Sequence, residues 1–199
     1  MVKQRFIIGM SGASGVIYGI RLLEHLSQRT DLESHLVMTK PAERTVVEET
    51  DYRVEQVKEL ATFCHSPLDI GASIASGSFQ ASGMAVVPCS IHTVSAIAYC
   101  HADNLLTRAA DVTLKERRKL VLVVRETPLH RGHLKAMLEA TESGAIILPP
   151  VPAFYTRPKT LSDLVDHTVG RILDQLGLEN HLVQRWGEDK TDTGPGLQV

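Results

Sequence analysis

Short runs of apolar residues alternate along the chain with longer stretches in which apolar residues recur every three or four positions. Continuously apolar runs are typical of parallel strands buried on both faces, and the three-to-four spacing is typical of helices. The runs lie at residues 6–10, 35–38, 84–88, 120–124 and 145–148. Besides a helix after the first run, we expect helices at 91–101, 105–118, 129–141 and 161–177, the last capped by Thr160 and ended by Gly177. This alternation predicts an α/β fold with a parallel sheet.

The first apolar run ends in a turn rich in glycine and serine, Gly9-Met10-Ser11-Gly12-Ala13-Ser14-Gly15. Glycine lets the backbone approach an anion closely, and Ser14 can offer its hydroxyl to a ligand and cap the following helix. Amides at the start of such a helix are suited to binding phosphate. The GxxGxxG spacing is neither the dinucleotide GxGxxG nor the P-loop GxxxxGK[ST], so the turn predicts either a nucleotide-type ligand or a plain strand-to-helix connection.

Polar residues also follow the other predicted strands where those strands end. In a doubly wound sheet, ligands bind outside the carboxyl ends of the strands. A dinucleotide site would place an acidic residue after the second strand, but this chain has Thr39-Lys40 there. We therefore expect a mononucleotide with a phosphate and a heteroaromatic ring at one edge of the sheet. Its ligands would come from residues 11–14, Thr39, residues 90–93 and Arg125.

The composition is that of an ordinary globular protein, with 199 residues, 43% of them hydrophobic and 22% charged. A formal charge of −2 gives no general attraction to nucleic acid, and no apolar run approaches the roughly 20 residues needed to span a bilayer. Without a signal peptide, the expected location is the cytoplasm. Three cysteines without CxxC spacing predict buried free thiols. We expect residues 1–186 to form one domain and the polar residues 187–199 a C-terminal tail.

Charged and aromatic residues in the second half of the chain allow two interpretations each. Arg108 and Lys115 are two helical turns apart with Asp111 between them, which fits a solvated ladder of ion pairs or an anion site. Tyr155, in a proline-rich loop, is either a packing aromatic or a phenol presented to a ligand. For Arg171, at mid-helix, the simpler interpretation is a solvated side chain.

Blocks of sequence over most of the chain resemble the UbiX-type flavin prenyltransferases, long described as aromatic-acid decarboxylases. The likeness runs in order from about residue 5 to Trp186, and LKERR at 114–118 and VRETP at 124–128 are its most specific blocks. The other blocks are Gly12-Ala13-Ser14-Gly15, Glu49-Thr50-Asp51, Ser76-Gly77-Ser78, Pro88-Cys89-Ser90, Arg108-Ala109-Ala110-Asp111 and Pro152-Ala153-Phe154-Tyr155. The resemblance implies a flavodoxin-like (Rossmann-like) three-layer fold and assembly as a dodecamer.

The same resemblance implies an activity. Members of this family join a dimethylallyl group from dimethylallyl monophosphate to reduced FMN, closing a fourth ring between flavin N5 and C6. They supply the prenylated FMN to a UbiD-type decarboxylase, in ubiquinone synthesis or aromatic-acid breakdown. A monophosphate needs no aspartate-bound magnesium, so the lack of an acidic cluster in the last predicted helix agrees with a metal-independent reaction.

Carried over by position, the resemblance implies residues for each part of the site. FMN would contact Gly12, Ala13, Ser14, Thr39, Ser90, Ile91, His92, Thr93 and Arg125. Many relatives have serine at the position of Thr39. Threonine keeps the hydroxyl group and adds a methyl group. The prenyl phosphate would be bound by Arg108, Lys115, Tyr155 and Arg171, and the catalytic residues would be Ser14, Glu49, Lys115 and Glu126. Of these, we expect Glu126 and the phosphate to move protons during ring closure, assisted by Glu49 and Ser14.

Two other functions stay open at this point. A flavin-dependent decarboxylase of peptidyl or pantothenoyl cysteine resembles this chain at the strand ends, but it uses a histidine base and a PxMNxxMW segment that this sequence lacks. A carrier of unmodified FMN would need the glycine turn and Arg125 but not the residues assigned to the prenyl phosphate. A zinc site is not expected, because His130 and His133 have no third partner at metal-ligand spacing.

Overall fold

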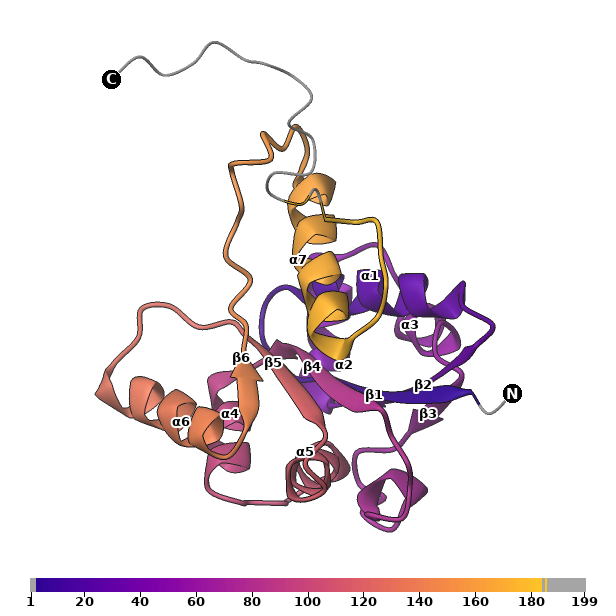
Figure 1. Cartoon of the computed structure of the whole chain (residues 1–199), viewed down its shortest axis with the longest axis vertical. Helices are drawn as coiled ribbons and strands as arrows, with labels where there is room; N and C mark the ends of the chain where they lie inside the picture. The colour runs from indigo at the N-terminus through magenta and orange to yellow at the C-terminus, as the bar shows by residue number, and fades with distance from the viewer. Residues whose placement is uncertain (1–2, 184, 186–199) are drawn as a thin grey trace.

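Six parallel strands form one twisted sheet in the computed structural model, which describes residues 3–183 and 185 (Figure 1). The strands are β1 (Gln4–Met10), β2 (Leu32–Met38), β3 (Phe63–His65), β4 (Gly83–Cys89), β5 (Lys119–Val124) and β6 (Ala145–Ile147). Their order across the sheet is β3-β2-β1-β4-β5-β6. The order reverses between β1 and β4, which is where doubly wound sheets bind their ligands.

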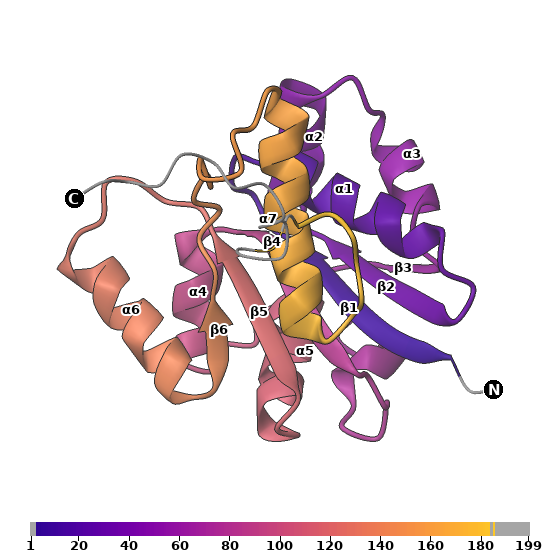
Figure 2. The ribbon, with the colours of Figure 1, turned by 45° about the horizontal axis from the view of Figure 1, so that its top comes forward.

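Helices cover both faces of the sheet (Figure 2). One face carries α1 (Val16–Ser27), α2 (Lys40–Glu49), α3 (Val54–Glu59) and α7 (Leu161–Leu176). The other carries the short 3-10 helix η1 (Ser73–Ala75), α4 (Ile91–Ala98), α5 (Leu105–Lys115) and α6 (Arg131–Glu142). The predicted three-layer, flavodoxin-like arrangement is therefore confirmed.

The side chains of β1 alternate between the two helix layers, because successive residues of a strand point to opposite faces. Phe6 and Ile8 pack in the cluster that contains α1 and α7, whereas Ile7 packs in the cluster that contains α4 and α5. All three side chains are at most 2% exposed. Burial on both faces explains why the strands are continuously apolar in the sequence.

The five predicted strands are present as β1, β2, β4, β5 and β6. The structure adds β3 at one edge of the sheet and the helices α2 and α3, which the apolar pattern did not predict. At α7 the predicted ends are confirmed, since the Thr160 side chain accepts a hydrogen bond from the Asp163 backbone and Gly177 ends the helix in the left-handed conformation.

Two local predictions were wrong. Ser14 does not cap α1, because the chain enters that helix through Gly15 in the left-handed conformation, with φ of 96°. Of the three cysteines only Cys89 is buried, since Cys64 lies on the edge strand β3 and Cys100 lies just beyond α4. The predictions for Trp186 and the tail at 187–199 fall outside the described residues. Within the part of the chain that the structure describes, no helix is long and apolar enough to cross a membrane.

Candidate functional site

Ser11 joins the carboxyl ends of β1 and β4 at the reversal of strand order. Its hydroxyl donates to the carbonyl oxygen of Pro88 (3.1 Å) and accepts from the backbone N–H of Ser90 (2.7 Å). The residue is 2% exposed, so these bonds are shielded from water. They hold the glycine turn beside the start of α4, and two groups of residues assigned to the flavin thus become neighbours.

The start of α4 presents hydroxyl groups and free amides at this edge. The Ser90 hydroxyl oxygen accepts from the backbone N–H of Thr93 (3.2 Å) and lies 3.0 Å from the Thr93 hydroxyl. The first N–H groups of a helix lack partners inside the helix, so those of Ile91 and His92 are available to an anion. This corner fits a phosphate group.

Thr39 and Arg125 complete the row of strand ends. Thr39 caps α2 by accepting from the backbone N–H of Ala42 (3.3 Å), and its own N–H donates to the carbonyl oxygen of Met10 (3.0 Å). The backbone N–H of Arg125 donates to the carbonyl oxygen of Cys89 (3.0 Å), while the exposed side chain reaches a cavity above the sheet edge. The predicted gathering of strand-end residues at one edge is what the structure shows.

The amides at the start of α1 are already occupied by a side chain. One carboxylate oxygen of Glu49, the last residue of α2, accepts from the backbone N–H groups of Gly15 (2.8 Å) and Val16 (3.3 Å). A carboxylate is favoured there by the positive end of the helix dipole. The expectation that these α1 amides hold a phosphate therefore does not apply to this structure, and the start of α4 is the better phosphate position.

Gly12 is the turn residue that the packing requires to be glycine. A Cβ atom added to Gly12 would lie 2.3 Å from the Cβ of Pro41 in α2, well inside any contact that real Cβ atoms make. The backbone of the turn and the first turn of α2 are therefore in direct contact. No larger residue can occupy position 12 unless one of the two segments moves.

A cavity of about 660 Å³ lies above this edge, between α1, the end of α2 and α7. Its size is within the usual range for sites that bind small molecules and cofactors. One side is polar, with Ser14, Glu49 and Arg125, and the other is apolar, with Ile17, Tyr18, Leu161, Leu164 and Val165. Burial raises the pKa of the Tyr18 phenol, so that group stays protonated. A cavity of this kind can hold an aromatic ring system beside an apolar group.

The cavity walls are tied together by a chain of polar contacts. The Tyr52 hydroxyl donates to Glu24 (2.6 Å), Glu24 pairs with Arg21 (3.1 Å), and Arg21 donates to both carboxylate oxygens of Asp166 (2.6 and 3.1 Å). These four residues come from the segment after α2, from α1 and from α7. The bidentate Arg21–Asp166 pair fixes α7 against α1 at the cavity.

Arg171 lines a second cavity of about 380 Å³ between β6 and α7, and Tyr155 contacts a residue of that lining. Arg171 lines the second cavity together with His167, and it pairs with Asp174 one turn further along α7 (2.9 Å). The Tyr155 ring, 51% exposed, contacts the ring of His167 edge to face, with centroids 5.7 Å apart. The structure thus brings these two predicted phosphate ligands to the middle of α7.

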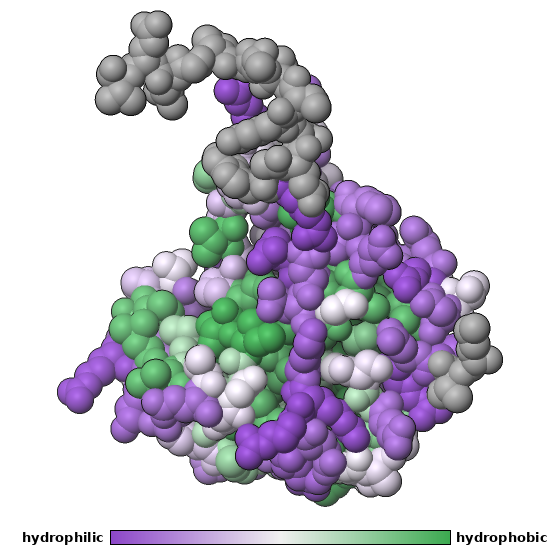
Figure 3. Space-filling view, viewed as in Figure 1, coloured by the Kyte–Doolittle hydropathy of each residue, from purple (hydrophilic) through white to green (hydrophobic). Residues whose placement is uncertain are grey.

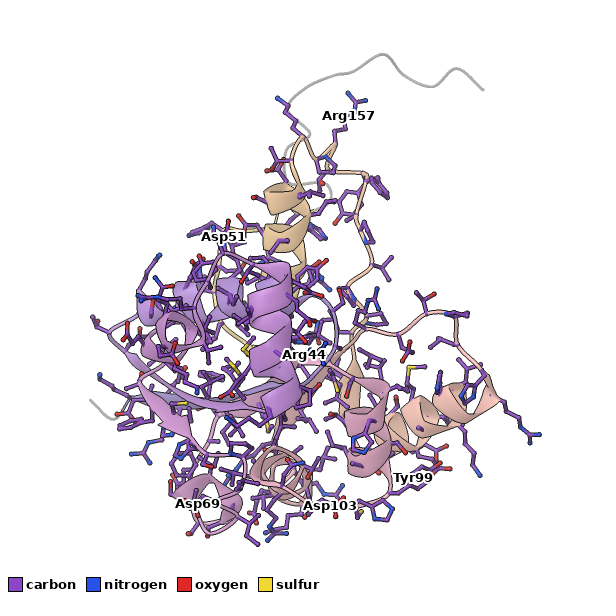
Figure 4. All side chains as sticks on the ribbon, turned by 180° about the vertical axis from the view of Figure 1, so that it is seen from behind. Arg44, Asp51, Asp69, Tyr99, Asp103 and Arg157 are labelled. Carbon is purple, nitrogen blue, oxygen red and sulfur yellow. The ribbon has the colours of Figure 1, made fainter. Side chains whose placement is uncertain are left out.

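Arg108 and Lys115 do not reach that place within one chain. They lie on α5, which packs on the face of the sheet opposite α7, and Lys115 is near the amino end of β5, whereas Arg125 follows its carboxyl end. Figure 4 shows Asp51, which lines the main cavity, close to α7, and Asp103, just before α5, at the far end of the molecule. Arg108 pairs with Asp111 (2.8 Å) and Lys115 with Glu116. The four predicted phosphate ligands are therefore split into two pairs.

Glu126 follows Arg125 at the carboxyl end of β5, and one of its carboxylate oxygens accepts from the backbone N–H of Thr127 (3.1 Å). Tyr18 and Leu164 are residues of this region that the sequence interpretation did not assign. Ser11 was predicted among the strand-end ligands, and its usable signal was that it directly follows the first strand. Tyr18 and Leu164 carried none, because an apolar position in a helix has the same pattern whether it faces a core or a cavity.

Comparison with known proteins decides the family. The Flavoprotein family model matches residues 1–173. A flavin prenyltransferase UbiX from Thauera aromatica is 59% identical over 182 residues, which span 92% of this chain and 93% of that protein. The chain belongs to the UbiX flavin prenyltransferases. The UbiX of Escherichia coli K12 is 56% identical over 185 residues, which span 92% of this chain and 98% of its own.

Solved structures of UbiX proteins have the same fold. A crystal structure of AnUbiX (PadA1) in complex with FMN and dimethylallyl pyrophosphate superimposes with a TM-score of 0.90 at 49% identity, covering 92% of this chain and 97% of that one. A dodecameric FMN-dependent UbiX-like decarboxylase from Escherichia coli O157:H7 gives the same TM-score and identity over 92% and 99% of the two chains. The predicted family and its flavodoxin-like fold are confirmed.

A more distant likeness concerns the fold alone. The peptidyl-cysteine decarboxylase EpiD superimposes with a TM-score of 0.64 at 16% identity, covering 88% of this chain and 99% of that one. Shared architecture at this level carries no argument about the reaction. Membership of the UbiX family therefore removes the reason for assigning the cysteine decarboxylase activity to this chain.

Proposed function

We propose that the chain transfers a dimethylallyl group from dimethylallyl monophosphate to N5 and C6 of reduced FMN, without a metal ion. The observation that carries this proposal is the cavity in which Ser14, Glu49 and Arg125 face an apolar wall. The segment 149–152 lines both this cavity and the second one, where Arg171 lies and where Tyr155 contacts His167. Family membership supports a flavin as one of the two ligands.

The described residues fit FMN. The start of α4 offers the amides of Ile91 and His92 and the hydroxyls of Ser90 and Thr93 to its phosphate. Gly12, Ala13 and Ser14 supply a turn without bulk, and Thr39 and Arg125 lie on either side of it. When bound, the reduced flavin supplies the nucleophilic N5 and C6 positions.

Tyr155 and Arg171 would bind the phosphate of the prenyl donor. When the allylic C–O bond breaks, the negative charge moves to the phosphate oxygens, where a guanidinium and a phenol stabilise it by charge-assisted hydrogen bonds. Arg108 and Lys115 can add two more cations only from another copy of the chain, because α5 lies on the opposite face of the sheet.

Carboxylates near the cavity would move the protons. Ring closure requires one proton to be added to the prenyl unit and one to be removed from the flavin carbon. Glu126 and the released phosphate are the groups proposed for these transfers, and Glu49 and Ser14 assist from the turn. Glu49 is held in position by the backbone N–H groups of Gly15 and Val16.

An oligomer, as in the dodecameric relative, agrees with the surface of the chain. Leu134 and Leu138 on α6 are each 55% exposed, and Val151 and Phe154 are each 70% exposed. Figure 3 shows apolar residues gathered over α6 and β6. Apolar patches of this kind are typical of protein interfaces. We further propose that the prenylated flavin is delivered to a UbiD-type decarboxylase.

The test is anaerobic incubation of the FMN-loaded protein with a reductant and dimethylallyl monophosphate, followed by mass spectrometry of the released flavin. We expect the flavin mass to increase by one isoprene unit, and the same increase with excess chelator. Dimethylallyl pyrophosphate is the matched second donor, since the AnUbiX crystal structure contains it. Unmodified flavin with both donors would refute the proposal and support a carrier, and loss of activity with chelator would refute metal independence.

A further inference from the structure

His167 is a buried histidine that none of the catalytic or binding assignments uses. It lies on α7 one turn before Arg171, so the two side chains share a face of the helix. The residue is 9% exposed, and it lines both the cavity of Arg171 and a third cavity of about 400 Å³ on its other side. His167 thus separates two cavities along the middle of α7, beside Arg171.

The ring of His167 contacts the ring of Tyr155 with an interplanar angle of 85° and a centroid distance of 5.7 Å. This is an edge-to-face aromatic pair with favourable geometry. Tyr155 lies in the segment between β6 and α7, which turns on itself through hydrogen bonds such as Thr156 to Ala153 (3.1 Å) and Arg157 to Phe154 (3.0 Å). The ring contact therefore connects the phenol of a loop residue to a fixed helix.

The helix itself is anchored where His167 is attached. The preceding residue, Asp166, accepts two hydrogen bonds from Arg21 of α1, at 2.6 and 3.1 Å. Because α1 starts at the glycine turn, the position of His167 is set relative to the flavin site. Tyr155 thus packs against a helix that is itself fixed to α1.

The surroundings keep the His167 ring neutral. Burial lowers its pKa, Arg171 lowers it further, and Asp174 partly opposes both effects. The other charged or titratable groups around the same cavities are Arg157, Lys159, Asp163, Asp166 and His181. A neutral aromatic ring can pack against Tyr155 without adding a second charge beside Arg171.

We propose that His167 is a positioning residue for the prenyl phosphate, in which its neutral ring holds the Tyr155 phenol beside Arg171. This inference rests on the proposed function for the role of Tyr155 and Arg171. It assigns no proton transfer to His167. The ring matters through its shape, so phenylalanine should replace it, and the cavities on both sides leave room for the larger ring.

The test compares His167→Phe, His167→Ala and His167→Gln, with His181→Ala as the matched control that removes a histidine from the far cavity. An edge-to-face pair contributes enough that its loss should raise the KM for dimethylallyl monophosphate about three- to tenfold in the Ala and Gln variants. We expect the Phe variant to stay within about twofold of wild type, and FMN affinity to be unchanged in all four. A Phe variant as impaired as Ala, or an Ala variant with unchanged KM, would overturn the proposal.

A second measurement does not depend on turnover. Inorganic phosphate is titrated into the FMN-loaded variants by calorimetry, with Tyr155→Phe as reference. We expect wild type and His167→Phe to bind phosphate with equal affinity, and His167→Ala to bind it about three- to tenfold more weakly. If wild type produces no prenylated flavin but this order holds, the proposed reaction fails and the positioning role stands. If all variants bind phosphate equally, the positioning role fails whatever the reaction.

Discussion

Glu49 lines the main cavity and also joins two elements of the fold. Its carboxylate accepts from two backbone N–H groups at the start of α1, a contact that joins the end of α2 to the glycine turn. In the sequence it is one acidic residue in a row of polar ones at 48–51, and only the family resemblance assigned it a role. The partner amides lie 34 and 33 positions away, so no local pattern could reveal the contact.

Substitution of Arg171 or Lys115 should impair the reaction with the prenyl donor without weakening FMN binding. We expect Arg171→Ala and Lys115→Ala to bind FMN with wild-type affinity and to lower kcat/KM for dimethylallyl monophosphate about 10- to 100-fold, because each removes a charge-assisted hydrogen bond to phosphate. Flavin fluorescence measures the first quantity and product mass the second. Lys135→Ala, an exposed lysine on α6, is the control. Normal turnover in either variant would remove that residue from the phosphate site.

At the scale of elements, the direct contact between the glycine turn and α2 gives a sharp test. Gly12→Ala would place a Cβ atom 2.3 Å from Pro41, so α2 or the turn must move. We expect a loss of about 1–3 kcal/mol in the free energy of unfolding and weaker FMN binding. Urea unfolding monitored by circular dichroism measures the first effect.

Gly71→Ala is the matched control, because the nearest atom to a Cβ there is Asp69 Oδ1 at 3.5 Å, an ordinary contact. We expect that variant to unfold within about 0.5 kcal/mol of wild type. Equal stability of the two variants would mean that the turn can separate from α2 at little cost.

The elements that the sequence predicted are those with a continuous or periodic apolar signal. Strands such as β4 are buried along their whole length, so their residues are continuously apolar and the run is visible in the sequence. Helix α2 buries only Ala42 and Val46, and β3 is a three-residue edge strand, so neither has enough apolar positions to form a pattern. The strand-end residues of the site were predictable because parallel strands place their carboxyl ends together. The cavity wall was not, since it depends on how α7 packs against α1.

At the scale of the whole molecule, the placement of α5 bears on how many chains make one site. Mixing Arg171→Ala chains with Lys115→Ala chains, by co-expression or by reversible dissociation, should restore part of the activity that each lacks alone. The reason is that a mixed oligomer contains sites with an intact Arg171 from one chain and an intact Lys115 from another. Product mass and analytical ultracentrifugation check this. Continued inactivity of a verified mixed oligomer would place both residues in one chain's site.

The whole chain should also lose stability in mild acid. Burial lowers the pKa of His35 to about 4, and the pKa values of His25, His65 and His167 are lowered mainly by burial as well. These groups bind protons more readily in the unfolded chain, so their contribution is present above pH 6.5 and is lost as the pH falls toward 4.

We expect protonation of His35 alone to lower the free energy of unfolding by about 1–2 kcal/mol when the pH falls from 7.5 to 5. Its ring stacks on Phe63, with centroids 4.8 Å apart, so His35→Phe keeps an aromatic contact and removes the titration. The variant should show a flatter dependence of the unfolding free energy on pH between 7.5 and 5, measured by urea unfolding. A dependence as steep as that of wild type would assign the acid sensitivity to other groups.

The contacts of Gly12 with Pro41 and of Glu49 with the start of α1 close a ring of three segments: the turn leads into α1, α2 begins against the turn, and α2 ends on α1. A ligand that arrives at the turn meets backbone that cannot shift alone. The loss of conformational entropy needed to order the flavin-binding edge therefore occurs when the chain folds, and association with FMN need not include it. Binding at this edge should be fast and close to rigid-body docking.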